Sequence, residues 1–144
     1  MNFIADIGLS PDAFTFDLST LNKKSIMKTQ EIAKRFHELA MEGKWDQIQD
    51  ELFSKEARSI EPAHAQGFQS VTGLDKIKQK AKQWQDMVEE THGGYCSEPM
   101  VAGSFFTCAM SADVTMKGQG RSKMDEIGVY EVKDGKIVSE QFFF

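Results

Sequence analysis

The sequence has few cysteines and prolines, no excess of basic residues and no long apolar run. Its 144 residues include 2 cysteines and 3 prolines, and 17 Lys and Arg stand against 22 Asp and Glu. Two cysteines in a chain that can form an ample core indicate reduced, structural thiols rather than a disulfide framework. A net charge of −5 argues against nucleic acid as a partner. No segment approaches the roughly 20 apolar residues of a membrane span, so no membrane partner is expected.

The first residues also lack the features of a signal peptide, because Asp6, Asp12 and Asp17 interrupt any apolar stretch. We therefore expect a cytoplasmic protein. Residues 1–26 show neither a helical nor a strand period, which predicts a partly ordered N-terminal arm ahead of one domain at 27–144. In an alternative interpretation, the apolar side chains of this arm dock on the domain or on a partner subunit.

Three helices are predicted before the last third of the chain. Apolar residues recur at helical spacing over 29–40 and again over 45–53. A third apolar stripe covers 72–88, with Thr72 as the expected N-cap and Trp84 as a buried, structural member of the stripe. Charged residues opposite such a stripe usually form a solvated face. To that face we assign Lys76, Lys78, Lys80 and Lys82.

The remainder alternates between apolar and polar residues, which is the period of a strand. One short strand is expected between the second and third helices, and four more follow the third helix. Helices that precede an antiparallel sheet define an α+β fold in which the sheet curls around the helices. The five strands are expected at 57–61, 95–101, 105–116, 122–132 and 137–144.

Several kinds of chemistry have no support in the sequence. The three histidines, His37, His64 and His92, lack metal-ligand spacing, and the cysteines form no Cys-x-x-Cys pair. No glycine-rich loop precedes a helix, and no Gly-x-Ser-x-Gly nucleophile motif is present. We expect neither a metal nor another cofactor.

Several sequence motifs, together with the element order, resemble one known family. They are Trp45-Asp46 at the start of the second helix, Ile60-Glu61-Pro62 at the end of the first strand, and the closing hairpin 129–142 with its Asp-Gly turn. The chain resembles the SnoaL-like branch of the nuclear transport factor 2-like superfamily. This resemblance implies a cone-shaped domain, with a curved antiparallel sheet on three helices, a pocket inside the cone, and a homodimer formed across the open sheet face.

The resemblance leaves two functions open. Relatives include ketosteroid isomerases and polyketide cyclases, which shift protons in an apolar cavity, and others that only bind or dimerise. We expect a small apolar ligand, handled either by isomerase or cyclase chemistry with a carboxylate base and no metal, or by a non-catalytic dimerisation or ligand-carrier module. Two or more titratable groups converging in the pocket would favour an enzyme. The cyclase relatives carry a His-Trp-Asp run in the last strand, but here Phe142 replaces the aspartate and cannot transfer a proton.

Three acids are candidates for the catalytic base. Glu61 ends the first strand at the position where the family often has an acid before proline. Glu126 and Glu140 share strand parity with apolar and aromatic residues, where desolvation tunes a carboxyl pKa towards neutrality. Glu126 is the first choice, because Gly128 beside it is expected to leave room for a ligand. For each acid, the alternative is a solvated or interface carboxylate.

Four further residues are candidates for ligand binding. His64 follows Pro62 near the expected mouth of the cone, and His64 or Tyr130 would donate a hydrogen bond to developing negative charge. Trp84 and Phe142 would form part of the pocket wall. For His64 the alternative is a surface histidine, and for Trp84 it is a core role.

Overall fold

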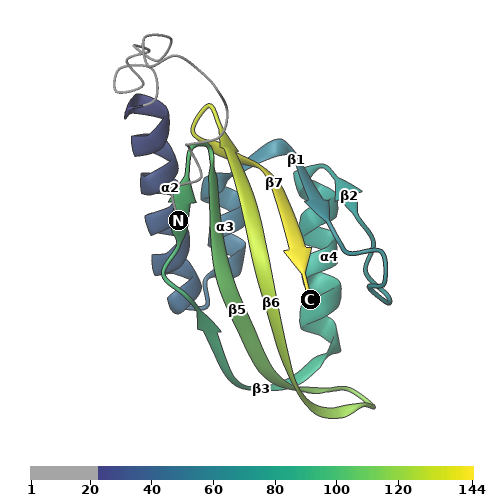
Figure 1. Cartoon of the computed structure of the whole chain (residues 1–144). Coiled ribbons are helices and arrows are strands. Elements are labelled where there is room, and N and C mark those ends of the chain that lie inside the picture. Colours follow the sequence, from purple (N-terminus) through teal and green to yellow (C-terminus); the bar gives the residue numbers. More distant parts are fainter. Residues whose placement is uncertain (1–22) are drawn as a thin grey trace, which may run out of the picture.

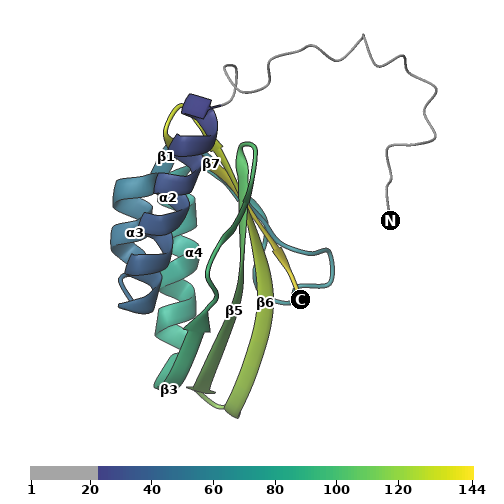
Figure 2. The ribbon, with the colours of Figure 1, turned by 60° about the vertical axis from the view of Figure 1, so that its left-hand side comes forward.

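One curved, unclosed sheet forms the body of the protein, and three helices cover one of its sides. The computed structural model describes residues 23–144, with side chains from Lys28 onward. Figure 1 looks onto the open face of the sheet, and Figure 2 shows the helices gathered on the opposite side. This architecture confirms the predicted α+β fold of a sheet curved over three helices.

The helices lie close to their predicted positions. They are α2 (Lys23–Met41), α3 (Trp45–Leu52) and α4 (Leu74–Met87). Because α2 begins at Lys23, the helix includes the last part of the predicted arm 1–26. The rest of that arm lies outside the described residues.

The sheet contains seven strands, with β7 between β1 and β6. Neighbouring strands follow the order β2-β1-β7-β6-β5-β3, and β4 pairs with β5. The sheet is mixed rather than purely antiparallel as expected, because β1 pairs with β7 in parallel, whereas the other pairings among the described strands are antiparallel. The strands are β1 (Phe53–Ile60), β2 (Val71–Thr72), β3 (Val88–Cys96), β4 (Met100–Ala102), β5 (Phe105–Met116), β6 (Gly120–Lys133) and β7 (Lys136–Phe143).

Two local predictions are wrong, one about the start of the third helix and one about the strand that follows it. Thr72 is not the N-cap of α4, because it belongs to β2 and pairs with Arg58. Gly73 takes the cap position with a φ of 105°, and no side chain caps the helix. The chain then passes directly from α4 into β3 at Val88, and β3 includes the Gly93-Gly94 pair and ends at Cys96. The single strand expected at 95–101 is therefore wrong, because its residues are divided between the end of β3 and β4 (Met100–Ala102).

Aromatic side chains fill the space between α2 and the sheet. The Phe36 ring lies 4.6 Å from that of Tyr130 and 5.4 Å from that of Phe106, measured between centroids. Phe106 and Tyr130 stack at 4.8 Å. Trp84 is not fully buried as expected, because it lies at the lower end of α4, where its ring is partly exposed and contacts Phe68.

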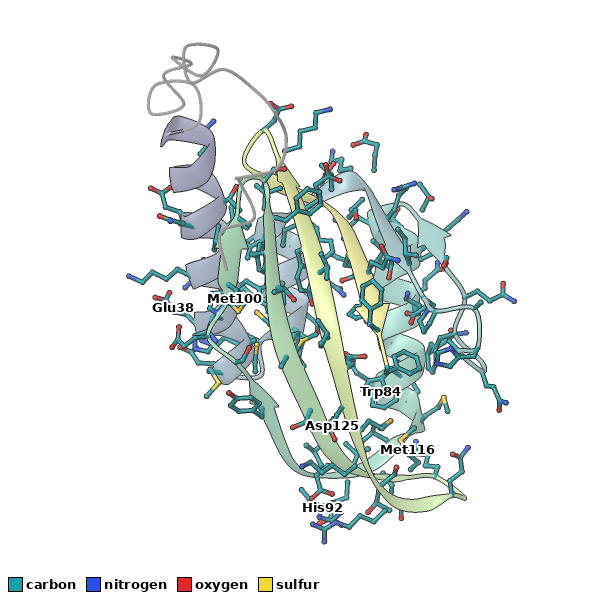
Figure 3. The ribbon with its side chains drawn as sticks, viewed as in Figure 1. Glu38, Trp84, His92, Met100, Met116 and Asp125 are labelled. Atoms are coloured by element: carbon teal, nitrogen blue, oxygen red, sulfur yellow. The ribbon has the colours of Figure 1, made fainter. Side chains whose placement is uncertain are left out.

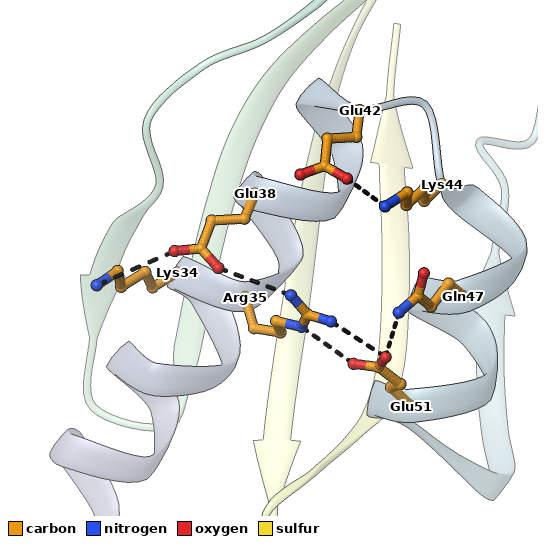
Figure 4. A network of polar contacts seen from close by, with 7 residues as sticks. All are labelled: Lys34, Arg35, Glu38, Glu42, Lys44, Gln47 and Glu51. Atoms are coloured by element: carbon orange, nitrogen blue, oxygen red, sulfur yellow. Dashed lines mark hydrogen bonds and ion pairs between the residues drawn. The ribbon is translucent and has the colours of Figure 1, made fainter.

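Polar contacts on the surface connect α2 to α3. Arg35 on α2 binds Glu51 on α3 through two hydrogen bonds of 3.0 and 3.1 Å, and Gln47 also donates to Glu51 (Figure 4). These groups are largely exposed, so each pair contributes only a fraction of a kcal/mol. Within the described residues, no helix is both long and apolar enough to cross a membrane.

Candidate active site

Strand register brings the three predicted acids to the helix side of the sheet. Glu126 on β6 lies opposite Met110 of β5. Glu140 on β7 lies opposite Tyr130 on one side and Ser59 of β1 on the other. Glu61 follows the end of β1, two residues after the fully buried Ser59. The carboxyl groups of three separate strands therefore gather beside α4.

A lysine from α4 lies at the centre of this group. Lys80 Nζ lies 2.6 Å from Glu61 Oε1 and 2.5 Å from Ser59 Oγ, and its ammonium group lies 5.8 Å from the centroid of the Phe142 ring. The side chains of Lys80 and Glu61 are only 12% and 11% exposed. We call Ser59, Glu61, Lys80, Glu126 and Glu140 the carboxyl cluster.

Two of the acids hold their protons unusually tightly. Burial raises the pKa of Glu126 to about 7, and the negative charge of Glu61 adds to this effect, whereas Lys80 opposes it. Burial also raises the pKa of Glu140 to about 7, against a hydrogen bond from Ser59 and the charge of Lys80. Because both pKa values lie near neutrality, each carboxyl group can take up or release a proton at physiological pH.

The cluster also contains an organised hydrogen-bond chain. Lys80 donates to the Ser59 hydroxyl, and that hydroxyl donates to Glu140. An ammonium group has three donors, and two of those on Lys80 are directed at Glu61 and Ser59. The arrangement therefore combines a fixed positive charge with two titratable carboxyl groups, which suits proton transfer to and from a neutral organic molecule.

Two surface hollows reach members of the cluster. A groove of about 450 Å³ between α4 and the segment after β1 extends to Lys80. Its remaining lining is mainly polar, and consists of Ala65, Gly67, Gln69, Val71, Lys76, Gln79 and Gln83. A second hollow of about 480 Å³ includes Glu126 and Met110, together with residues of the open sheet face such as Tyr95 and Ile127.

Gly128 does not leave room for a ligand, so that part of the prediction is wrong. A Cβ atom on Gly128 would lie 2.7 Å from the Tyr130 hydroxyl and 2.8 Å from the terminal methyl of Met110. The Tyr130 hydroxyl also contacts Met110 Sδ at 3.8 Å. The space vacated by the missing side chain is thus occupied by the protein's own core.

The four predicted binding residues do not form one group. Phe142 lies at the carboxyl cluster, below Lys80. Tyr130 is fully buried behind Gly128, and burial raises its pKa well above the usual value. His64 is exposed, and its Nε2 lies 2.8 Å from the Phe144 carbonyl oxygen. Trp84 comes from the end of α4 on the helix side of the sheet (Figure 3).

The sequence interpretation missed Lys80 and Ser59. Lys80 was assigned to the solvated face of α4, but it lies three residues after the buried Ile77 and four before Trp84. That spacing places it on the apolar face of the helix, and it is the signal that could have identified it. Ser59 lies two residues after the buried Ala57 on β1, so the two side chains point to the same face of the sheet. This spacing predicts the orientation of Ser59 but not its hydrogen-bond partners.

The cluster does not resemble a metal centre. Among the side chains described from residue 28 onward, no three His, Cys, Asp or Glu residues are grouped so that they could hold a metal ion. The Lys80 ammonium group occupies the position beside Glu61 that a cation would need. The titratable carboxyl groups and the Lys80 ammonium group are suited to acid–base chemistry.

The fold resembles that of solved proteins described as cystatin-like or nuclear transport factor 2-like. The family model for the SnoaL-like domain matches residues 27–144, and the chain belongs to this family. No curated protein sequence matches the chain.

Solved structures agree with this assignment. One is a protein from Mesorhizobium loti that is described as a SnoaL-like polyketide cyclase and also as a carbohydrate phosphatase. It is 36% identical to this chain, with a TM-score of 0.74, and the match covers 79% of this chain and 97% of that one. A cystatin-like protein of unknown function from Xanthomonas campestris is 16% identical, with a TM-score of 0.67 and coverage of 80% and 88%. A ketosteroid isomerase-like protein from Catenulispora acidiphila, in complex with trimethylamine, is 18% identical, with a TM-score of 0.62 and coverage of 79% and 85%.

Proposed function

We propose that the protein binds a small carbonyl compound at the carboxyl cluster and moves a proton on it, as an isomerase or cyclase does. Glu126 is the base, and Lys80 holds the substrate oxygen. The observation that carries the proposal is the convergence of Glu61, Glu126, Glu140 and Lys80 from three strands and one helix. A module that only carries a ligand or dimerises has no need of several interacting titratable groups.

The roles follow from the charges. Glu61 is paired with Lys80 at 2.6 Å, so its carboxylate balances the ammonium group and is poorly placed to act as a free base. Among the described residues Glu126 has no ion-pair partner, and its pKa of about 7 gives a substantial deprotonated fraction at neutral pH. It would remove a proton from the carbon next to the carbonyl group. The third donor of Lys80 would then stabilise the negative charge that develops on the oxygen.

Glu140 would serve as a second proton-holding group that is linked to the Lys80 ammonium group. It is buried and connected to Lys80 through the Ser59 hydroxyl. When negative charge develops near Lys80, the chain of hydrogen bonds shifts the pKa of Glu140 upwards and keeps this second carboxyl group neutral. The Phe142 ring supplies an apolar contact for the hydrocarbon part of the ligand.

The test is proton transfer on simple ketones, with no natural substrate needed. A panel of β,γ-unsaturated cyclic ketones reports isomerisation by the ultraviolet absorbance of the conjugated product, and α-deuterated ketones report exchange by mass spectrometry. Glu126→Gln should lower the rate by about 10²–10⁴-fold, which is the usual contribution of a general base. The rate of the parent protein should rise with pH and reach half its maximum near pH 7, because Glu126 must be deprotonated.

Asp125→Asn provides the matched control. Asp125 is the neighbour of Glu126 on β6, but it is exposed on the open face of the sheet (Figure 3). It should leave the rate unchanged. If ketones bind, as shown by calorimetry, but exchange deuterium no faster than they do in buffer, the enzyme proposal is rejected. The ligand-carrier module is then favoured.

The homodimer expected from the resemblance belongs to the same proposal. Apolar side chains on the open face of the sheet are exposed on four strands, including Tyr95 on β3, Phe105 on β5, Ile127 on β6 and Phe143 on β7. Ile127 and Phe143 lie directly opposite each other in the strand register. Exposed apolar side chains gathered on one face of a sheet are typical of a protein interface, and a second copy of the same face would cover them.

A further inference from the structure

The groove that extends to Lys80 has a second end, which the proposed proton transfer does not use. Its wall on α4 consists of four side chains at positions i, i+3, i+4 and i+7, which share one face of the helix. They are Lys76, Gln79, Lys80 and Gln83. The opposite wall comes from the segment after β1 and from β2, and consists of Ala65, Gly67, Gln69 and Val71. We call the space between these two walls the α4 groove.

The charges of the α4 groove favour an anion. The chain carries 22 Asp and Glu, but none of them is among the described residues that line the groove. The lining offers instead the ammonium groups of two lysines and the amide groups of three glutamines. Ammonium and amide N–H groups are donors, and a carboxylate is the acceptor that forms the strongest hydrogen bonds with them. The groove is thus suited to a carboxylate, although the net charge of the chain is −5.

Lys76 differs from the other lysines of α4 because no acid neutralises it. The other three each form an ion pair, which joins Lys78 to Asp50, Lys80 to Glu61 and Lys82 to Asp86. Among the side chains described from residue 28 onward, no carboxylate forms an ion pair with Lys76. Its positive charge is therefore available to a ligand, one helical turn from Lys80.

The wall opposite α4 is held in place by the protein itself. The Phe68 ring of this segment contacts Trp84 of α4, with 6.1 Å between the ring centroids. At the base of the segment, the Glu61 N–H group donates a hydrogen bond of 2.9 Å to Ser70 Oγ. The groove therefore exists without a ligand, and a small molecule that enters it does not have to order the segment first.

We propose that the α4 groove binds a carboxylate of the ligand, so that the substrate class is a short oxo acid. Lys76 binds the carboxylate, and Gln79 lies beside it as a further donor. The position of the carbonyl group rests on the proposed function, in which Lys80 holds the carbonyl oxygen. Side chains four residues apart on a helix have Cβ atoms about 5–6 Å apart, which an acid with about two or three carbon atoms between its carboxylate and its carbonyl group can span. A 2-oxo acid, whose two groups are adjacent, is too short.

The experiment measures binding to the full-length protein by calorimetry. The probes are 4-oxopentanoate, its neutral methyl ester and its isomer 2-oxopentanoate. The first should bind about tenfold more tightly than the other two, because it alone reaches Lys76 with a carboxylate while its carbonyl group lies at Lys80. Its advantage over the ester should shrink as salt is added, since Lys76 is exposed.

Two variants identify the lysine that binds the carboxylate. Lys76→Met should weaken the binding of 4-oxopentanoate about tenfold and leave that of the ester unchanged. Lys82→Met is the matched control, because Lys82 does not line the groove and pairs with Asp86. It should leave both affinities unchanged. Equal affinities of the parent protein for the acid and its ester, or for the two isomeric acids, would overturn the inference, and these readings need no variant.

Deuterium exchange beside the carbonyl group separates this inference from the proposed function. With 4-oxopentanoate, Lys76→Met should raise KM and leave kcat unchanged, because Lys76 contacts a part of the ligand that does not react. Exchange on neutral ketones with no preference for the acid would overturn the oxo acid and retain the proton transfer. Binding of the acid that depends on Lys76 but leads to no exchange would support the carboxylate site and reject the proton transfer.

Discussion

The Lys80 side chain affects the charge and the protonation of the carboxyl groups around it. Its ammonium group is nearly buried and joins Glu61 to Ser59, next to two carboxyl groups whose pKa values lie near 7. Without this cation, three carboxyl groups would share a desolvated space with no positive charge. The carboxyl cluster therefore depends on Lys80 for its stability as well as for its proposed chemistry.

Lys80→Met should be strongly destabilising. It leaves the Glu61 carboxylate buried without a partner, and removal of one member of a buried pair costs about 3–5 kcal/mol. The free energy of unfolding in urea measures the effect. Lys78→Met is the matched control on the same helix, because Lys78 and its partner Asp50 are largely exposed and the loss of a surface pair costs little stability. Equal losses in the two variants would show that Lys80 acts only through its hydrocarbon chain.

The candidate acids could be predicted from the sequence, but their partners could not. Strand parity places Glu126 and Glu140 on an apolar face, and the end of β1 marks Glu61. That they converge depends on the parallel pairing of β1 with β7, which joins segments far apart in the chain. Four lysines at two-residue intervals look alike in composition, and only their positions relative to Ile77 distinguish Lys80 from the others.

At the scale of elements, β6 carries both the site and the core. Glu126 reaches the carboxyl cluster, while Gly128 and Tyr130 on the same face close the space behind it. Alternation predicted that these residues share a face, but it could not predict that the Tyr130 side chain folds back over Gly128. The order of α3, β1 and α4 was predictable because the spacing of apolar residues changes where each element begins or ends. The start of β3 was predicted too late in the chain, because two glycines lie inside the strand.

Gly128→Ala should destabilise the protein by about 1–3 kcal/mol through overpacking. The added methyl group would lie 2.7–2.8 Å from atoms of Tyr130 and Met110, both held in the core. Thermal unfolding followed by circular dichroism measures the loss. Gly93→Ala on β3 is the control, because a Cβ atom there meets nothing within 4 Å and its backbone needs no positive φ. A Gly128→Ala protein as stable as this control would mean that Tyr130 moves aside freely.

For the whole molecule, the two buried acids make a contribution to stability that falls as the pH rises. Glu140 has a pKa of about 7 in the folded protein against an ordinary value of 4.5, so the folded state binds its proton more tightly than the unfolded chain. The resulting stabilisation is complete below about pH 4.5 and is lost as the pH rises through 7. Glu126 acts in the same direction.

Urea unfolding between pH 5 and pH 8 measures this dependence. Glu140→Gln should flatten the fall in stability, because the amide carries no charge at either pH. Glu56→Gln, at an exposed position on β1, should keep the slope of the parent protein. A Glu140→Gln protein whose stability changes with pH just as that of the parent does would show that Glu140 is ionised in the folded state.

The open face of the sheet predicts a dimer. Light scattering at micromolar concentration should give twice the 16.2 kDa mass of one chain. Ile127→Glu should shift the protein towards the single-chain mass, because it places a charge in the middle of the apolar surface. Met41→Glu, at an exposed position on α2 away from that face, should leave the mass unchanged. A single-chain mass for the parent protein would remove the dimer from the proposal.

The placement of β7 between β1 and β6 also affects how the protein folds during its synthesis. The ribosome makes β1 early, but the partner on its inner edge, β7, emerges after every other described strand. Until then β1 carries an unpaired edge that can associate with other nascent chains. Glu140 arrives on the same late strand, so the carboxyl cluster is assembled in one of the final folding steps. Chaperones that shield exposed strand edges would be expected to increase the yield of folded protein.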